Sequence, residues 1–149
     1  MILRYILTDP LQRAVLLGYA DALESAYGAV VYMHCIREDG TGKTRLIASK
    51  SRVAPLKVIT IPRLELSACL VLSQLIKKVR SCLQMDIVEV ILHTDSAIAI
   101  AWINTPTYRL KTFIANQVEK IQSITEGCHW KHIVSHSNLA DVVSWGLNL

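Results

Sequence analysis

The 149-residue sequence lacks the features that mark membrane and secreted proteins. No uninterrupted apolar run reaches the ~20 residues that a membrane-spanning helix needs. Arg4, Asp9, Pro10 and Arg13 interrupt the apolar N-terminus, which leaves no core for a signal peptide. With no targeting segment visible, we expect a protein of the cytoplasm or nucleus that is not secreted and has no membrane partner.

Other absences exclude further classes. The four cysteines have no CxxC spacing and no pattern of a small secreted domain, so we expect reduced, mostly buried thiols. Zinc is disfavoured because no second cysteine pair closes a site around the candidates Cys128, His129, His132 and His136. The Asp-Thr-Gly and Asp-Ser-Gly triplets of aspartic peptidases are also missing.

The composition indicates a single α/β domain. Hydrophobic residues make up 52% of the chain, which suits a sheet whose central strands are covered on both faces. The net charge of +4 is a mild preference for polyanionic partners. We assign 1–14 to a leader or a remnant of an upstream polyprotein segment, and 15–149 to the domain.

Hydrophobic periodicity predicts the order β-β-β-α-β-α-α-β-α. Strands are expected at 14–20, 27–36, 44–49, 88–94 and 128–134. Helices are expected at 62–83, from Ala97 through Trp102, and at 110–124, and a last one is capped by Ser137 and Asn138.

Acidic residues stand at the ends of these elements. Asp21 and Asp95 each follow a strand, and a right-handed crossover would place the two strands side by side and parallel. Glu65 lies on the apolar stripe of helix 62–83, where an unpaired charge is costly, and Asp141 lies in the first turn of the last helix. As simpler alternatives, Asp95 could be a helix cap, Asp21 a turn former and Asp141 a capping acid.

The ordered motifs resemble the ribonuclease H region of BEL/Pao-type retrotransposon polyproteins. The resembling stretches span nearly everything from Gly18 to Gly146: Gly18-Tyr-Ala-Asp-Ala22, Tyr27-Gly-Ala-Val-Val-Tyr32, Ala48-Ser-Lys-Ser-Arg-Val-Ala-Pro-Leu-Lys57, Ile61-Pro-Arg-Leu-Glu-Leu66, Thr94-Asp-Ser96, Tyr108-Arg-Leu-Lys-Thr-Phe113 and Asn138-Leu-Ala-Asp141. The resemblance implies a mixed five-stranded sheet flanked by helices. The start at Met1-Ile-Leu-Arg, with no polymerase domain before it, leads us to expect a polyprotein fragment or a stand-alone relic.

The resemblance also implies an activity, the cleavage of the RNA strand of an RNA–DNA hybrid with two Mg²⁺ (or Mn²⁺) ions. Asp21 and Asp95 would be the central ligands, Glu65 would hold one ion and Asp141 the other, and carboxylates are the ligands that Mg²⁺ prefers. His136 matches a histidine that aids product release or proton transfer in some ribonucleases H, although a solvated loop histidine is the simpler reading. Reverse transcriptase and integrase segments of the same polyprotein would be further partners.

Three departures leave a second hypothesis open. Leu23, Leu139 and Trp145 replace a serine, a proline and an arginine that are usual in the family, although none of these changes removes a carboxylate. The alternative is a weakly active or inactive, domesticated or decayed domain that binds nucleic acid or protein. An integrase of the same superfamily is disfavoured because Glu65 precedes Asp95.

Basic residues near these motifs are candidates for binding backbone phosphates. One group surrounds the start of helix 62–83, and the other precedes helix 110–124; they are Lys50, Arg52, Lys57 and Arg63, then Arg109 and Lys111. Each could equally be a solvated surface charge.

Overall fold

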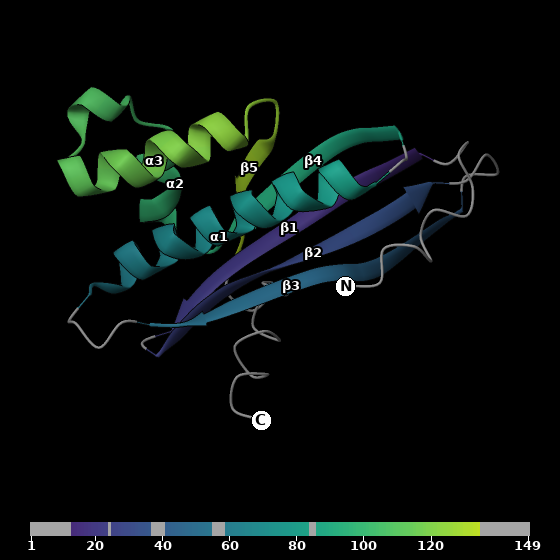
Figure 1. Ribbon diagram of the computed structural model, residues 1–149, viewed down its shortest axis with the longest axis horizontal. Coiled ribbons are helices and arrows are strands. Elements are labelled where there is room, and N and C mark those ends of the chain that lie inside the picture. The colour runs from purple at the N-terminus through teal and green to yellow at the C-terminus, as the bar shows by residue number, and fades with distance from the viewer. Residues whose placement is uncertain (1–12, 24, 37–40, 55–58, 84–85, 135–149) are drawn as a thin grey trace.

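The protein is a five-stranded mixed sheet with helices packed on one face, as seen in a computed structural model (Figure 1). The structure describes residues 13–23, 25–36, 41–54, 59–83 and 86–134. The strands are β1 (Arg13–Leu23), β2 (Ala26–Ile36), β3 (Gly42–Val53), β4 (Asp86–Thr94) and β5 (His129–His132). The helices are α1 (Ile61–Cys82), α2 (Ala97–Ile103) and α3 (Thr112–Ile124), with a 3₁₀ turn, η2, at Thr107–Arg109.

The sheet has the strand order β3-β2-β1-β4-β5. Strands β1, β2 and β3 are antiparallel neighbours, whereas β4 pairs in parallel with β1 and β5 pairs in parallel with β4. The three antiparallel strands and the parallel placement of β4 beside β1 confirm the predicted topology. Parallel strands end at the same edge of a sheet, so the C-terminal ends of β1 and β4 lie together.

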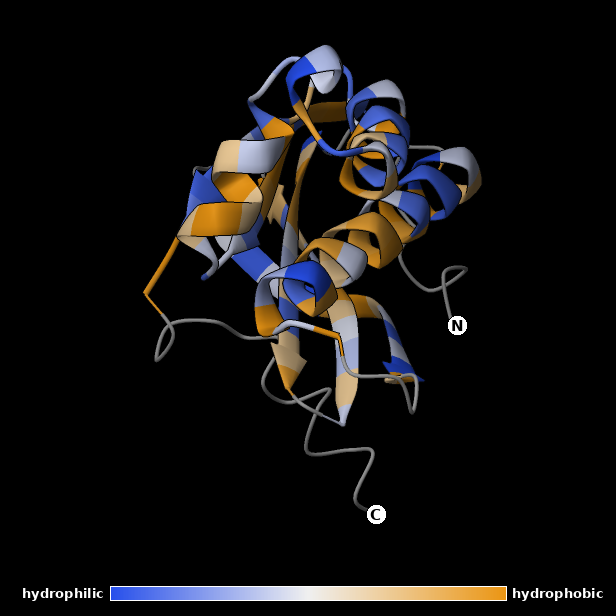
Figure 2. Ribbon diagram, turned by 90° about the vertical axis from the view of Figure 1, so that its left-hand side faces the viewer, coloured by the Kyte–Doolittle hydropathy of each residue, from blue (hydrophilic) through white to orange (hydrophobic). Residues whose placement is uncertain are grey.

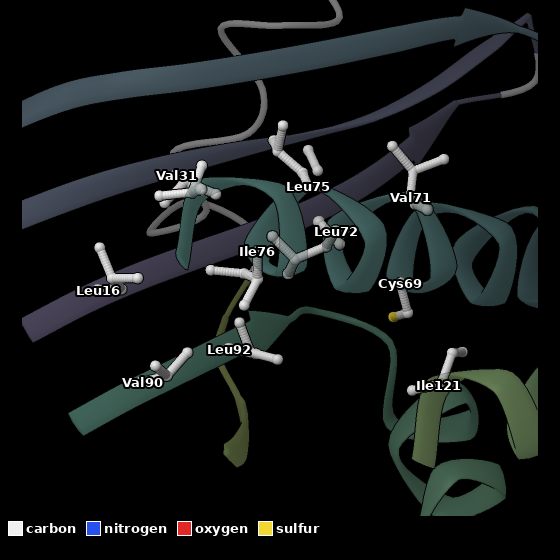
Figure 3. Close-up of a cluster of buried hydrophobic side chains, with 14 of the residues drawn as sticks. Leu16, Val31, Cys69, Val71, Leu72, Leu75, Ile76, Val90, Leu92 and Ile121 are labelled. Carbon is white, nitrogen blue, oxygen red and sulfur yellow. The ribbon is translucent and has the colours of Figure 1, made fainter. Parts of the chain in front are cut away.

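Helix α1 packs along β1 and β2 and supplies most of the core on its face of the sheet (Figure 3). Leu72 and Ile76 are fully buried against Leu16 and Leu92 of the sheet. The side chains pack tightly over Gly18, where a Cβ atom would lie 2.7 Å from Leu72 Cδ1 and 2.8 Å from Leu92 Cδ2. Glycine at position 18 therefore leaves room for the Leu72 and Leu92 side chains. The helices carry apolar residues on the inner side and hydrophilic residues outside (Figure 2).

Several predicted boundaries were wrong. Strand β1 does not end before Asp21; it continues to Leu23 because β1 and β2 stay paired up to Leu23 and Ala26. Strand β3 is longer than 44–49 because it pairs with β2 along its whole length. The helix predicted over 110–124 begins two residues later, as α3 at Thr112, and η2 precedes it. The predicted last helix, from Ser137 onward, lies outside the described residues.

No helix in the described part of the chain is both long enough and apolar enough to cross a membrane.

Candidate carboxylate site

The ends of β1 and β4 bring two acidic residues to one edge of the sheet. The last parallel pair of these strands is Ala20 with Thr94, so Asp21 and Asp95 are the next residues on two neighbouring strands. Neighbouring strands lie about 4.8 Å apart. The expectation that Asp21 and Asp95 emerge beside each other is therefore met at the level of the backbone.

Asp21 is a buried residue inside the β1–β2 hairpin. It is 6% exposed and its register partner is Gly28. Because it is paired within the ladder, Asp21 is not a turn residue, and that simpler reading of it is wrong. Side chains alternate along a strand, and Gly18 and Ala20 face α1, so Asp21 points to the opposite face of the sheet.

Glu65 lies near the start of α1 and approaches the end of β4. Its carboxyl is partly buried, and burial is the largest cause that raises its pKa. A hydrogen bond from the hydroxyl of Ser96 lowers the pKa in part, and the negative charge of Asp95 raises it again. Glu65 and Asp95 thus form a pair of like charges at the C-terminal end of the sheet.

Ser96 connects this acidic pair to the next helix. It is the N-cap of α2, and its hydroxyl accepts a hydrogen bond from the backbone N–H of Ala99 at 3.0 Å. The backbone N–H of Ser96 donates to Thr94 Oγ1 at 3.2 Å. Because Ser96 is the cap, the reading of Asp95 as a helix cap is wrong, and the Asp95 carboxylate is not used for capping.

The thiol of Cys69 lies beneath the acidic pair. Cys69 is fully buried one turn after Glu65, and it hydrogen-bonds to the side chain of Thr94. Burial, together with the charges of Glu65 and Asp95, raises the pKa of this thiol to about 12. The floor of the site is therefore neutral and apolar, which strengthens electrostatic interactions above it.

His132, at the end of β5, holds the backbone on the other side of Asp95. Its Nε2 atom lies 3.0 Å from the carbonyl oxygen of Asp95, and the N–H of Ile133 donates to the carbonyl of Thr94 at 3.0 Å. A carbonyl oxygen only accepts hydrogen bonds, so Nε2 of His132 carries the proton. Strand β5 thereby fixes the segment from which Asp95 projects.

The donor set has the chemistry that a divalent metal requires. Glu65 and Asp95 provide hard carboxylate oxygens, and a cation would offset the repulsion that raises the pKa of Glu65. Within the described residues, however, no group of three or more His, Cys, Asp or Glu side chains is close enough to hold a metal ion. The structure therefore brings Glu65 and Asp95 together and leaves the side chain of Asp21 on the far face.

Other predicted site residues are outside the described part of the chain. These are the proposed fourth ligand, the loop histidine and one basic residue, namely Asp141, His136 and Lys57.

The predicted phosphate-binding residues that the structure describes lie in three places. Lys50 and Arg52 are exposed on β3, and Arg109 and Lys111 are exposed on either side of the step from η2 to α3. Arg63 instead belongs to α1 and contacts α3, where its guanidinium carbon is 4.0 Å from the centroid of the Phe113 ring. This packing gives Arg63 a structural contact that the sequence did not reveal.

Sequence reasoning gave no role at this site to three residues: Ser96, Cys69 and His132. Ser96 carried a visible signal, because a serine directly before an apolar helix is a common N-cap. Cys69 and His132 carried none, since their proximity to Asp95 depends on how α1 and β5 pack in three dimensions.

Comparisons with known proteins agree with this architecture. A sequence profile described as "Pao retrotransposon-like RNaseH-like domain" matches residues 1–96, which include Asp21, Glu65 and Asp95. No match was found among curated proteins.

Two solved structures match this chain. The crystal structure of LC11-RNase H1 in complex with RNA/DNA hybrid aligns with a TM-score of 0.53 at 14% identity, over 85% of this chain and 88% of that one. RNase H1 from the halophilic archaeon Halobacterium salinarum NRC-1 aligns with a TM-score of 0.47 at 14% identity, over 85% of this chain and 89% of that one. At this identity the first likeness shows the fold alone. The fold is that of ribonuclease H, and the chain belongs to the family of Pao retrotransposon-like RNaseH-like domains.

Proposed function

We propose that this domain is a metal-dependent endonuclease that cleaves the RNA strand of RNA–DNA hybrids, as a module of a retrotransposon polyprotein. The observation that carries the proposal is the pairing of Glu65 with Asp95 at the C-terminal end of β4, beside the end of β1. Ligand sites of open α/β sheets lie at this edge. The relative LC11-RNase H1 was crystallised with an RNA/DNA hybrid, which supports the same substrate class here.

The residues would divide the work as follows. Asp95 would be one central ligand, and Asp21 would be the other once its side chain turned around the end of the sheet toward Asp95. Glu65 and Asp141 would each add a carboxylate to one of two Mg²⁺ or Mn²⁺ ions. Bound metal would supply activation of a water and stabilisation of the leaving oxygen. Ser96 orients the Glu65 carboxylate through its hydrogen bond, and His132 holds the backbone of Asp95.

The wider setting is part of the proposal. Reverse transcriptase and integrase segments of the same polyprotein would be neighbours of this domain, and its action would take place in the cytoplasm or nucleus. The mild positive charge of the chain suits a polyanionic substrate.

Leu23, Leu139 and Trp145, which replace residues usual in the family, favour a second candidate, a weakly active or inactive domain that only binds nucleic acid or protein. The two candidates make different predictions for one assay. We expect the wild-type protein to cut a hybrid labelled on its RNA strand when Mg²⁺ or Mn²⁺ is present, and Asp95→Asn to lose nearly all of this activity. The matched control is Asp86→Asn, an exposed acid at the opposite end of the same strand. Identical behaviour of the wild type and Asp95→Asn would support the binding-only candidate.

A further inference from the structure

Strand β3 forms one edge of the sheet among the described residues, and its charge is of one sign. Its twelve residues contain two lysines, two arginines and no acid. All four basic residues, Lys43, Arg45, Lys50 and Arg52, are exposed. No ion pair between described residues involves any of them. Their positive charge therefore faces solvent without a described counter-charge.

A β-bulge places the four basic side chains on the same face. Lys43 and Arg45 stand at odd positions and Lys50 and Arg52 at even ones, so strict alternation would send the two pairs to opposite faces. The register of β3 against β2 shifts by one residue at Ile47. Such a shift exchanges the two faces of a strand, so the bulge brings both pairs into line.

The face that they share is the one that α1 covers further along the sheet. Through β2, Lys50 stands level with Ala20 and Arg45 level with Leu16, and both of these β1 residues face α1. This row of basic side chains begins with Arg52, level with the C-terminal end of β1, and extends along β3 to Lys43, away from that end. The ten residues of strand from Lys43 to Arg52 make nine steps and cover about 30 Å.

A hollow between β3 and α1 lies beside this row. Its volume is about 620 Å³, and its lining combines the apolar Leu46 and Leu75 with Ser49, Gln74 and the two lysines Lys50 and Lys78. Lys78 adds a fifth exposed cation from α1. None of the described residues that line the hollow is aromatic, so they offer no stacking platform for a base. The chemistry is that of a backbone contact without sequence preference.

We propose that this row, the β3 track (Lys43, Arg45, Lys50, Arg52 and Lys78), binds the sugar–phosphate backbone of a nucleic-acid strand that extends beyond the carboxylates. The inference rests on the proposed function for the class of its ligand. A nucleic-acid strand carries a regularly spaced negative charge along about 30 Å, as the track requires. The track would hold long substrates in place while the carboxylate edge contacts a short segment of them.

The test measures binding without cleavage. Fluorescence anisotropy in EDTA would report the affinity for a labelled RNA–DNA hybrid of about 24 base pairs at several salt concentrations. We expect Lys43→Gln/Arg45→Gln to bind this hybrid more weakly and to reduce the slope of log affinity against log salt by about 1.8, since each lost phosphate contact contributes about 0.9. A hairpin-capped hybrid of about 6 base pairs is shorter than the track and would contact only part of it. Its affinity should therefore fall less than that of the long hybrid.

Two controls keep the result specific. Arg80→Gln/Lys120→Gln removes the same charge from exposed residues of α1 and α3, and α3 lies on the other side of α1 from β3 (Figure 1). The charge-preserving pair Lys43→Arg/Arg45→Lys should bind like the wild type, and circular dichroism would verify folding of each variant.

Each outcome decides the inference. Unchanged binding by Lys43→Gln/Arg45→Gln, or an equal loss in the control pair, would overturn it. Competition by polyglutamate as strong as that by unlabelled hybrid would also overturn it, because the partner would then be an acidic protein. A wild type that cuts hybrids while the track variant binds normally refutes the track alone. A wild type that cuts nothing, with a track variant that loses binding, supports the track and refutes the nuclease.

Discussion

Glu65 of α1 lies close enough to Asp95, at the end of β4, for the negative charge of Asp95 to add to burial in raising the pKa of the Glu65 carboxyl. Asp95 follows Glu65 by thirty positions, across the rest of α1, a connection and strand β4. The parallel pairing of β4 with β1 brings the two residues together. Folding a like-charge pair into a partly buried place costs stability unless a cation binds there. The predictions below follow from this arrangement and from the packing beneath it.

The first prediction concerns the charge of Glu65. Its pKa in the folded protein lies above the usual value of 4.5, so between these two values the folded state binds more protons than the unfolded state. The contribution of Glu65 to stability therefore decreases as the pH rises through this window. In EDTA we expect Glu65→Gln to melt at a higher temperature than the wild type near neutral pH, and the difference to vanish below about pH 4. The gain should be small because solvent screens a partly exposed carboxyl.

Thermal unfolding monitored by circular dichroism would measure this effect. Glu126→Gln, which removes an exposed acid after α3, is the matched control and should leave the melting temperature unchanged. A Glu65→Gln protein that is less stable than the wild type at neutral pH would show that the carboxylate is stabilised in the fold.

The second prediction concerns Gly18. A methyl group at this position would lie under 3.0 Å from the ends of the Leu72 and Leu92 side chains, so these buried side chains would have to rearrange. We expect Gly18→Ala to lower the free energy of unfolding by about 1–3 kcal/mol, the usual cost of overpacking a core. Urea denaturation would measure it. Combining Gly18→Ala with Leu72→Val should recover part of the loss, and a double variant no better than Gly18→Ala would contradict the packing at this contact.

The third prediction separates a structural from a substrate-binding role for Arg63. Its guanidinium lies over the ring of Phe113, which is 55% exposed. A double-mutant cycle with Arg63→Gln and Phe113→Leu should give a coupling of about 0.5–1 kcal/mol in stability, as for other exposed cation–π pairs. Coupling near zero, with a salt slope of hybrid binding reduced by about 0.9 in Arg63→Gln, would instead make Arg63 a phosphate contact.

The fourth prediction tests whether His132 positions Asp95. Loss of the bond to the Asp95 carbonyl should loosen the segment and weaken Mn²⁺ binding by about tenfold in His132→Ala, the low end of the effect of residues that orient metal ligands. His132→Gln can still donate a hydrogen bond and should recover much of the affinity. Calorimetric titration with Mn²⁺ would measure it. His129→Gln, an exposed residue of the same strand that is 4.0 Å from Glu89, is the control.

Much of the fold could be predicted because its signals are local. Apolar runs, the turn residues between strands and the first-turn proline, Pro62, marked the elements of the sheet and of α1. The handedness of crossovers then placed β4 beside β1. Boundaries were less accurate because backbone pairing continues past the apolar residues, as it carries β1 through Asp21 to Leu23.

The candidate site was only partly predictable. The position of Glu65 on an apolar stripe was a local anomaly, and the structure places it beside Asp95 as expected. The side on which Asp21 emerges depends on strand alternation relative to α1, which the sequence shows only once the register is known. The contacts of His132 and Arg63 come from the packing of β5 and α3, and no motif records them.

The most direct test of the central claim is a crystal structure of the protein soaked in Mn²⁺, with the ions located by their anomalous scattering. We predict that two ions bind at the C-terminal edge of β1 and β4, held by Asp21, Glu65, Asp95 and Asp141, and that Asp95→Asn crystals show neither. A well-ordered edge without manganese, or carboxylates that remain more than ~8 Å apart, would contradict a two-metal nuclease site.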